Sequence, residues 1–169
     1  MKVTRLLLLV TAITAAIILA NNVAQGDTPR GSWIKREYVD YCETIGMSEH
    51  VSPELLEAII ETESSGSAKA YNDTYGCYGL MQINRTAHYQ RIKRLGVTDL
   101  YDPKQNILVG ADYLQELFEK NGDDAMMVLM MYHGESKARQ KAAIGEYSRY
   151  ARKIVTRARE LERAHGKVE

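Results

Sequence analysis

The sequence predicts a mainly α-helical domain with at most a minimal β element, and three observations support this. Two segments begin with a polar residue followed by proline, Ser52-Pro53 and Asp102-Pro103. Such pairs are typical of helix starts, because the polar side chain accepts a hydrogen bond from a free amide and proline suits the first turn. Apolar residues recur at helical spacing behind both starts. Strand-like sequence is confined to a few residues around 76–83.

Length and composition indicate one globular domain with a core of ordinary size. The 169 residues are 45% hydrophobic and 26% charged, and the formal net charge is zero. This balance argues against nucleic acid as a partner held by bulk charge. The four histidines and two cysteines lack metal-ligand spacing, so we expect no metal and no cofactor.

The first 24 residues are typical of a targeting segment, with Lys2 and Arg5 ahead of an apolar run from Leu6 to Ala20. This run is shorter than the roughly 20 residues of a membrane-spanning helix, which favours a cleaved signal peptide. An anchor formed by residues 6–23 is the alternative, since no clear A-x-A cleavage motif is present. Both interpretations place the remaining chain outside the cytoplasmic membrane, as a secreted, periplasmic or wall-associated protein.

We expect a polar linker over 25–32, one domain over 33–165 and a short tail over 166–169. Within the domain, the segment 125–132 is apolar all round, which predicts the central buried helix. The expected helices cover 33–45, a segment from Ser52 past Glu63, 85–96, a segment from Asp102 to about Asn121, 125–132, 137–144 and 146–164.

Glu63 differs from the other glutamates of its helix. At about 100° per residue, it falls about 40° from Ile59, inside the apolar stripe. Glu54, Glu57 and Glu61 fall on the opposite face, which we expect to be solvated. Burial and the C-terminal end of the helix both disfavour negative charge, so we expect the raised pKa that a general acid needs. The alternative is that Glu63 bends back to water at a frayed helix end.

Cys42 and Cys77 are the two cysteines of the chain. Outside the cell they are candidates for a disulfide that ties the first helix to the Gly-rich loop. Two free thiols are the alternative, because pairing needs Cα atoms within about 7 Å of one another.

Four segments, in order and spacing, resemble the catalytic domain of the soluble lytic transglycosylases. They are Glu63-Ser64, GLMQIN at 79–84, YDPKQNI at 101–107 and GADYL at 110–114. The resemblance extends over roughly Tyr38 to Val155. It implies a lysozyme-like fold related to goose-type lysozyme.

The same resemblance implies that Glu63 is the single catalytic acid and base. It would protonate the glycosidic oxygen between N-acetylmuramic acid and N-acetylglucosamine in peptidoglycan. It would then take a proton from the C6 hydroxyl of the muramoyl sugar, which leaves a 1,6-anhydromuramoyl end. The family is thought to use the N-acetyl group of the substrate in place of a second carboxylate.

Further residues are assigned to the glycan groove by this resemblance. Ser64 is expected to orient Glu63 or the sugar. Met81 and Gln82 are expected to line the groove floor. Gly79 is expected to let the backbone turn and approach the sugar, as glycine does elsewhere. Without the resemblance, a packed turn is the preferred explanation of the residues from Gly79 to Ile83.

Three more positions on the C-terminal side match the family. Tyr132 matches a tyrosine beside the catalytic glutamate, although a core aromatic is the alternative. Glu146 and Tyr150 match a glutamate and a tyrosine of the family pattern. In the family, that glutamate lies across the cleft. The sequence departs from the family at His133-Gly134-Glu135, which replaces N-x-G, and at Ser148-Arg149. His133 is either an additional titrating group near the cleft or a surface residue.

Two other functions stay open at this point. A hydrolytic, goose-type lysozyme would need a further acidic residue that positions water, for which Asp73, Asp102 and Glu146 are candidates. A non-catalytic wall-binding or assembly module would use the groove only to hold glycan. Peptidoglycan strands are the expected partner in each case, and compact domains of this family accompany secretion, conjugation and phage apparatus.

Overall fold

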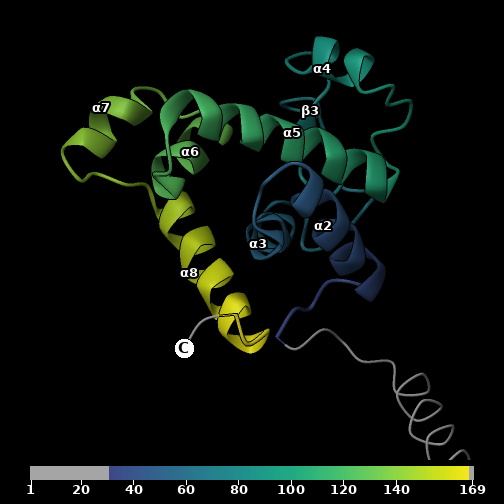
Figure 1. Ribbon diagram of the computed structural model, residues 1–169. Coiled ribbons are helices and arrows are strands. Elements are labelled where there is room, and N and C mark those ends of the chain that lie inside the picture. The colour runs from purple at the N-terminus through teal and green to yellow at the C-terminus, as the bar shows by residue number, and fades with distance from the viewer. Residues whose placement is uncertain (1–30, 168–169) are drawn as a thin grey trace, which may run out of the picture.

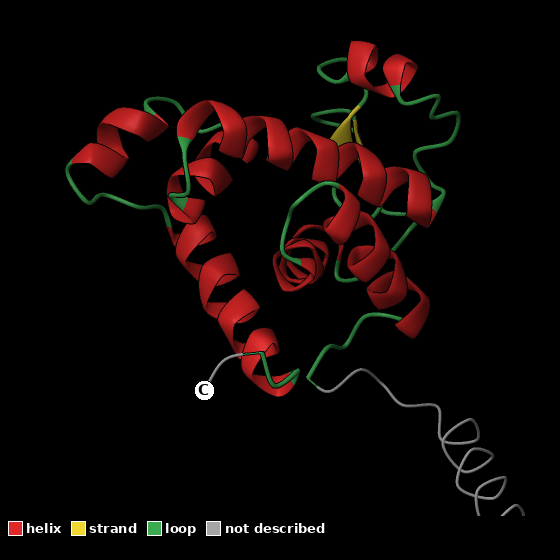
Figure 2. Ribbon diagram, viewed as in Figure 1, coloured by secondary structure: helices red, strands yellow, loops and turns green. Residues whose placement is uncertain are grey.

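The structure is a computed structural model that describes residues 31–167. The expected leader (1–24), most of the linker and the last two residues of the tail lie outside this range. Seven helices and one small sheet are described, which confirms the predicted mainly α fold (Figures 1 and 2). The helices are α2 (Arg36–Ser48), α3 (Pro53–Ser64), α4 (Tyr89–Arg94), α5 (Pro103–Asn121), α6 (Ala125–Tyr132), α7 (Ala138–Ala143) and α8 (Arg149–Ala164).

Helix α3 is the central helix, and it packs between α2 and α8 (Figure 1). Every residue from Glu54 to Glu61 is buried. The prediction that 125–132 is the central helix is therefore wrong. Only Val128, Leu129 and Met130 of α6 are buried, because this short helix lies at the margin of the core.

The predicted cap signals are confirmed. The Ser52 hydroxyl accepts a hydrogen bond from the Leu55 amide at the start of α3. The carboxylate of Asp102 accepts one from the Gln105 amide at the start of α5, over 2.8 Å. Elsewhere the helices are shorter than predicted: α4 covers half of 85–96, and α8 begins only after Ser148 caps it.

The prediction that Glu54, Glu57 and Glu61 form a solvated face is wrong, since all three are buried. Helix α8 covers this face and supplies the partners. Glu61 forms an ion pair with Arg157 at 2.6 Å, and Glu54 lies 2.9 Å from the imidazole of His165. A helical wheel reports which residues share a face, but not that a second helix with cations will cover it.

Glu57 is the unpaired member of this buried set. It is fully buried, and both of its carboxyl oxygens lack a hydrogen-bond partner among the described residues. Burial raises its pKa, and the imidazole of His165 offsets this only in part. Because the folded-state pKa is raised, the protonated form stabilises the fold. That contribution is complete at low pH and is lost as the pH rises through the folded-state pKa.

We therefore expect Glu57→Met to stabilise the protein at neutral pH, by about 1–3 kcal/mol, because an apolar side chain of similar length replaces a buried charge. Urea unfolding at pH 4 and at pH 7.5 checks this. The gain should be larger at the higher pH. An equal or smaller gain at pH 7.5 would mean that Glu57 is not a strained carboxylate.

The sheet joins α3 to α4 and consists of three two-residue strands in the order β1-β2-β3. Strands β1 (Tyr71–Asn72), β2 (Cys77–Tyr78) and β3 (Ile83–Asn84) pair antiparallel, with Tyr71 opposite Tyr78 and Cys77 opposite Asn84. This is the minimal β element that the sequence predicts.

Of the two alternatives for Cys42 and Cys77, the structure has two free thiols and no disulfide between them. Cys42 is fully buried in α2, whereas Cys77 lies on β2, partly exposed. The two thiols thus belong to different environments, which the sequence separation alone does not reveal. Within residues 31–167, none of the helices combines the length and apolarity that crossing a membrane requires.

Candidate active site

Glu63 lies in the last turn of α3, one residue before the helix ends at Ser64. The helix stops there because Ser65 adopts a left-handed backbone, with φ 52°. The side chain of Glu63 lines a cavity of about 690 Å³, which opens between the sheet, α4 and the end of α6. Its lining includes Glu63, Asn72, Tyr75, Cys77, Gln82, His88, Arg91, Tyr113, Tyr132 and His133.

The carboxyl of Glu63 has a hydrogen bond from Tyr150, whose hydroxyl donates to Oε1 over 2.5 Å. Burial raises the pKa of Glu63 above its ordinary value and outweighs the opposing effects of this hydrogen bond and of the charges on His133 and Lys153. Burial and the neighbouring Glu63 also raise the pKa of Tyr150, which keeps the phenol protonated as a donor. Glu63 therefore faces the cavity and does not bend back to bulk water.

We expect Tyr150→Phe to raise the pKa of Glu63 further. A hydrogen bond to the charged form stabilises the carboxylate, and the phenylalanine ring cannot donate one. The side-chain carboxyl of Glu63 can be titrated by NMR in both proteins. A midpoint that stays the same or falls in the variant would contradict the hydrogen bond seen in the structure.

The floor of the cavity is formed by Gln82, held in a left-handed backbone conformation with φ 49°. Its side-chain amide donates to the carbonyl of Gly79 over 3.0 Å. Met81 does not line the cavity, because its side chain is fully buried beneath the floor. Met81 contributes its carbonyl instead, which accepts a hydrogen bond from Tyr132 over 2.9 Å.

Asn106 holds this floor in place, a role that the sequence did not assign. It is fully buried in α5, where it accepts from the Met81 amide and donates to the carbonyls of Tyr78 and Leu100, each over 2.8 Å. Gly79 is required beside it, because a Cβ there would lie 2.4 Å from the Asn106 amide nitrogen. The sequence did contain a signal for this role, because Asn106 lies within the apolar pattern of its helix. A buried side-chain amide must be hydrogen-bonded, so such an asparagine is expected to hold a neighbouring segment.

Three rings that pack on one another form part of the cavity wall. The ring of Tyr132 lies 5.5 Å from that of Tyr113, which lies 4.5 Å from the imidazole of His88. Tyr113 and His88 were not predicted as site residues. They come from separate segments, and no spacing along the chain relates them to Glu63.

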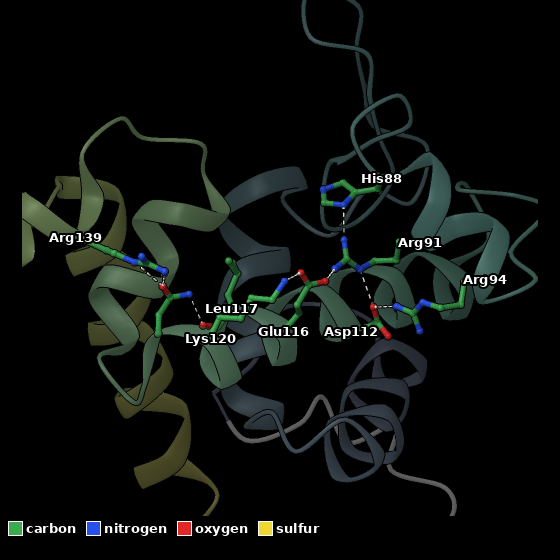
Figure 3. Close-up of polar contacts among 9 residues, drawn as sticks. His88, Arg91, Arg94, Asp112, Glu116, Leu117, Lys120 and Arg139 are labelled. Atoms are coloured by element: carbon green, nitrogen blue, oxygen red, sulfur yellow. Dashed lines mark hydrogen bonds and ion pairs between the residues drawn. The ribbon is translucent and has the colours of Figure 1, made fainter.

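Helix α4 is fixed to α5 by the polar network in Figure 3. Arg91 donates to Asp112 over 2.7 Å and also pairs with Glu116, while Arg94 reaches Asp112 over 2.6 Å. Burial and the neighbouring Arg91 lower the pKa of His88 to about 4, so its imidazole is neutral at pH 7 and stays beside the guanidinium. Because His88 and Arg91 line the cavity, this network sets the position of one wall.

Besides Met81, the expected site residues Ser64 and Glu146 do not line the cavity. The hydroxyl of Ser64 donates back to the carbonyl of Ile60 over 3.1 Å. Glu146 is exposed in the segment before α8 and does not line the cavity. The structure thus brings Gln82, Tyr132 and Tyr150 together around Glu63, with Gly79 and Met81 supporting them.

Glu63 is the single carboxylate among the residues that line this cavity. Across residues 31–167, there is also no cluster of histidine, cysteine and acidic side chains arranged to hold a metal ion. One protonatable carboxyl at the base of an open groove is an arrangement suited to general acid catalysis on an extended substrate.

Residues 40–155 match the transglycosylase SLT domain, and the chain belongs to that family.

Similar proteins include a transglycosylase of Enterobacteria phage PRD1, 37% identical over 99 residues, which are 57% of this chain and 35% of the phage protein. The endo-type membrane-bound lytic murein transglycosylase A of Klebsiella pneumoniae is 30% identical over 131 residues, 69% of this chain and 61% of the relative. The membrane-bound lytic murein transglycosylase E of Buchnera aphidicola is 30% identical over 92 residues, 50% of this chain and 41% of the relative. The chain thus matches less than two thirds of the length of each.

Among solved structures, the fold is similar to that of an inactive mutant of the lytic transglycosylase Slt from Pseudomonas aeruginosa. The TM-score is 0.65 at 17% identity, and the match covers 77% of this chain and 24% of that one. This likeness shows that the described residues have the fold of a lytic transglycosylase domain.

Proposed function

We propose that this protein is a peptidoglycan lytic transglycosylase. It cleaves the β-1,4 bond between N-acetylmuramic acid and N-acetylglucosamine and leaves 1,6-anhydromuramoyl ends. The observation that carries the proposal is Glu63, a half-buried carboxyl with a raised pKa and no second carboxylate in its cavity. Hydrolytic glycosidases ordinarily use two carboxyl groups, one of which acts on water or on the sugar itself.

The proposed reaction has two proton transfers, both at Glu63. The protonated carboxyl donates to the glycosidic oxygen as the bond to the anomeric carbon breaks. The resulting carboxylate takes the proton of the C6 hydroxyl, whose oxygen forms the new bond to the same carbon. The proton returns to Glu63, so the cycle is balanced and consumes no water. Burial favours the neutral carboxyl that starts the cycle, and the Tyr150 hydroxyl stabilises the carboxylate in its middle.

The proposed setting is the cell wall, outside the cytoplasmic membrane. The basic and apolar start of the sequence supports export, either by a cleaved signal peptide or by an anchor over residues 6–23. The relatives named as membrane-bound murein transglycosylases support a substrate in the wall. The PRD1 relative is a phage transglycosylase, which supports a role beside a phage apparatus, and a secretion or conjugation apparatus is the alternative.

Mass spectrometry of the soluble fragments from purified peptidoglycan tests the proposal. Anhydro ends, lighter than reducing ends by one water, are the expected product. Reducing ends would make the protein a lysozyme with a water-positioning carboxylate. Binding without any fragment would indicate a wall-binding module.

The pH dependence of the cleavage rate is a further prediction. A raised pKa extends the protonated form of Glu63 toward neutral pH, and the rate should fall as the pH rises through that pKa. Turbidity clearing of a peptidoglycan suspension between about pH 4 and 9 measures this. A rate that is constant over this range would exclude Glu63 as the titrating acid.

A further inference from the structure

A second ring lies behind the hydrogen bond between Tyr150 and Glu63. The imidazole of His133, which follows the last residue of α6, stacks on the phenol of Tyr150. The two ring centroids are 4.0 Å apart, and the ring planes are 15° from parallel. Tyr150 then donates its hydroxyl to Glu63 over 2.5 Å. Imidazole, phenol and carboxyl therefore form one row that starts at the end of α6 and joins α8 to α3.

His133 is also half exposed and has a charged neighbour. Its Nδ1 lies 3.6 Å from Oε1 of Glu135, and Lys141 of α7 lies 4.0 Å from Oε2 of the same carboxylate. The side chain is 50% exposed and lines the same cavity as Glu63. One face of the imidazole is thus fixed on Tyr150, while the ring stays accessible to solvent protons.

We propose that His133 is a positioning residue for Glu63 that acts through Tyr150. The stacked ring restrains the Tyr150 side chain from swinging about its Cα–Cβ bond. The hydroxyl therefore stays hydrogen-bonded to the Glu63 carboxyl and does not move toward the groove. An amide, which the resemblance places at this position, has no ring to stack and no charge to change. The catalytic consequence rests on the proposed function, whereas the contact between the three side chains does not.

The imidazole also acts on the charge of Glu63. When charged, His133 favours the Glu63 carboxylate, and Lys153 acts in the same direction, while burial favours the neutral carboxyl. The titratable and charged groups that face this row are Glu135, Lys141, Tyr132, Lys153 and Cys77. Because Glu63 must give up a proton and then regain it, His133 influences the pH range of turnover.

Two variants separate the ring from its charge. His133→Phe keeps a flat ring on Tyr150 and removes the charge, whereas His133→Ala removes both. We expect His133→Ala to lower kcat by about tenfold, since a misplaced hydroxyl no longer supports Glu63. We expect His133→Phe to keep most of kcat, but its rate should fall at a higher pH than that of the wild type, because a charge that favoured the carboxylate is gone. His50→Asn is the matched control, since it removes an imidazole outside the cavity at a left-handed position that asparagine tolerates.

NMR titration of the Glu63 side-chain carboxyl provides the decisive readout. It needs no turnover, so its result is independent of whether the chain cleaves peptidoglycan. The midpoint should move to higher pH in His133→Phe and stay unchanged in His50→Asn. An unchanged midpoint in His133→Phe, together with an unchanged kcat in His133→Ala, would overturn the assignment.

Discussion

Glu63→Gln is expected to abolish peptidoglycan cleavage while leaving the fold intact. The amide is nearly isosteric with the carboxyl, and its oxygen can still accept the hydrogen bond that Tyr150 donates to Glu63. What it lacks is a proton of suitable acidity. General acid–base groups contribute about 10²–10⁴-fold to a rate, and here one group performs both transfers, so we expect a loss of at least this size.

The rate of fragment release measures this loss. Glu119→Gln is the matched control, because Glu119 is exposed on α5 and does not line the cavity. Circular dichroism and urea unfolding should show all three proteins folded to the same extent. Clearing by folded Glu63→Gln at the wild-type rate would show that the acid lies elsewhere.

Arg157→Met is expected to have the largest effect on stability. The side chain of Glu61 is only 3% exposed, and Arg157 is its ion-pair partner, with contacts of 2.6 and 3.0 Å. Removal of one partner leaves an uncompensated buried charge, which costs about 3–5 kcal/mol. The pair also joins α3, which carries Glu63, to α8, which carries Tyr150, so the active site should loosen with it.

Urea unfolding of a double-mutant cycle tests this explanation. The double variant Glu61→Met/Arg157→Met should recover much of the lost stability, because a well-packed apolar pair can replace a buried ion pair. Arg159→Met, at an exposed position of the same helix, should change the free energy of unfolding by no more than about 0.5 kcal/mol. A small loss in Arg157→Met, or no recovery in the double variant, would contradict a buried charge pair at this site.

Local signals in the sequence were sufficient for the order of the helices, for several of their starts and for the position of Glu63. Ser52, Asp102 and Asp124 act through hydrogen bonds to amides three residues away, so their effect is visible in the sequence. The pattern around Ile59 likewise placed Glu63 on the inner face of its helix.

The other features of the fold and of the site depend on contacts between distant segments. Glu61 and Arg157 are 96 residues apart, and the wheel that placed Glu63 correctly assigned Glu61 to water. The row from His133 through Tyr150 to Glu63 depends on how α6, α8 and α3 pack together. Asn106 reaches the floor of the cavity only after α5 packs under the sheet. None of these contacts follows a regular spacing of residues along the chain, so no local sequence pattern predicts them.

The central claim is that one carboxyl in a groove cleaves the glycan without water as a reactant. Digestion of purified peptidoglycan in water labelled with heavy oxygen, followed by mass spectrometry of the new ends, tests it most directly. The account predicts anhydro ends that carry no label, and their absence in the Glu63→Gln digest. Labelled reducing ends from the wild-type protein would contradict it, because water would then have attacked the anomeric carbon.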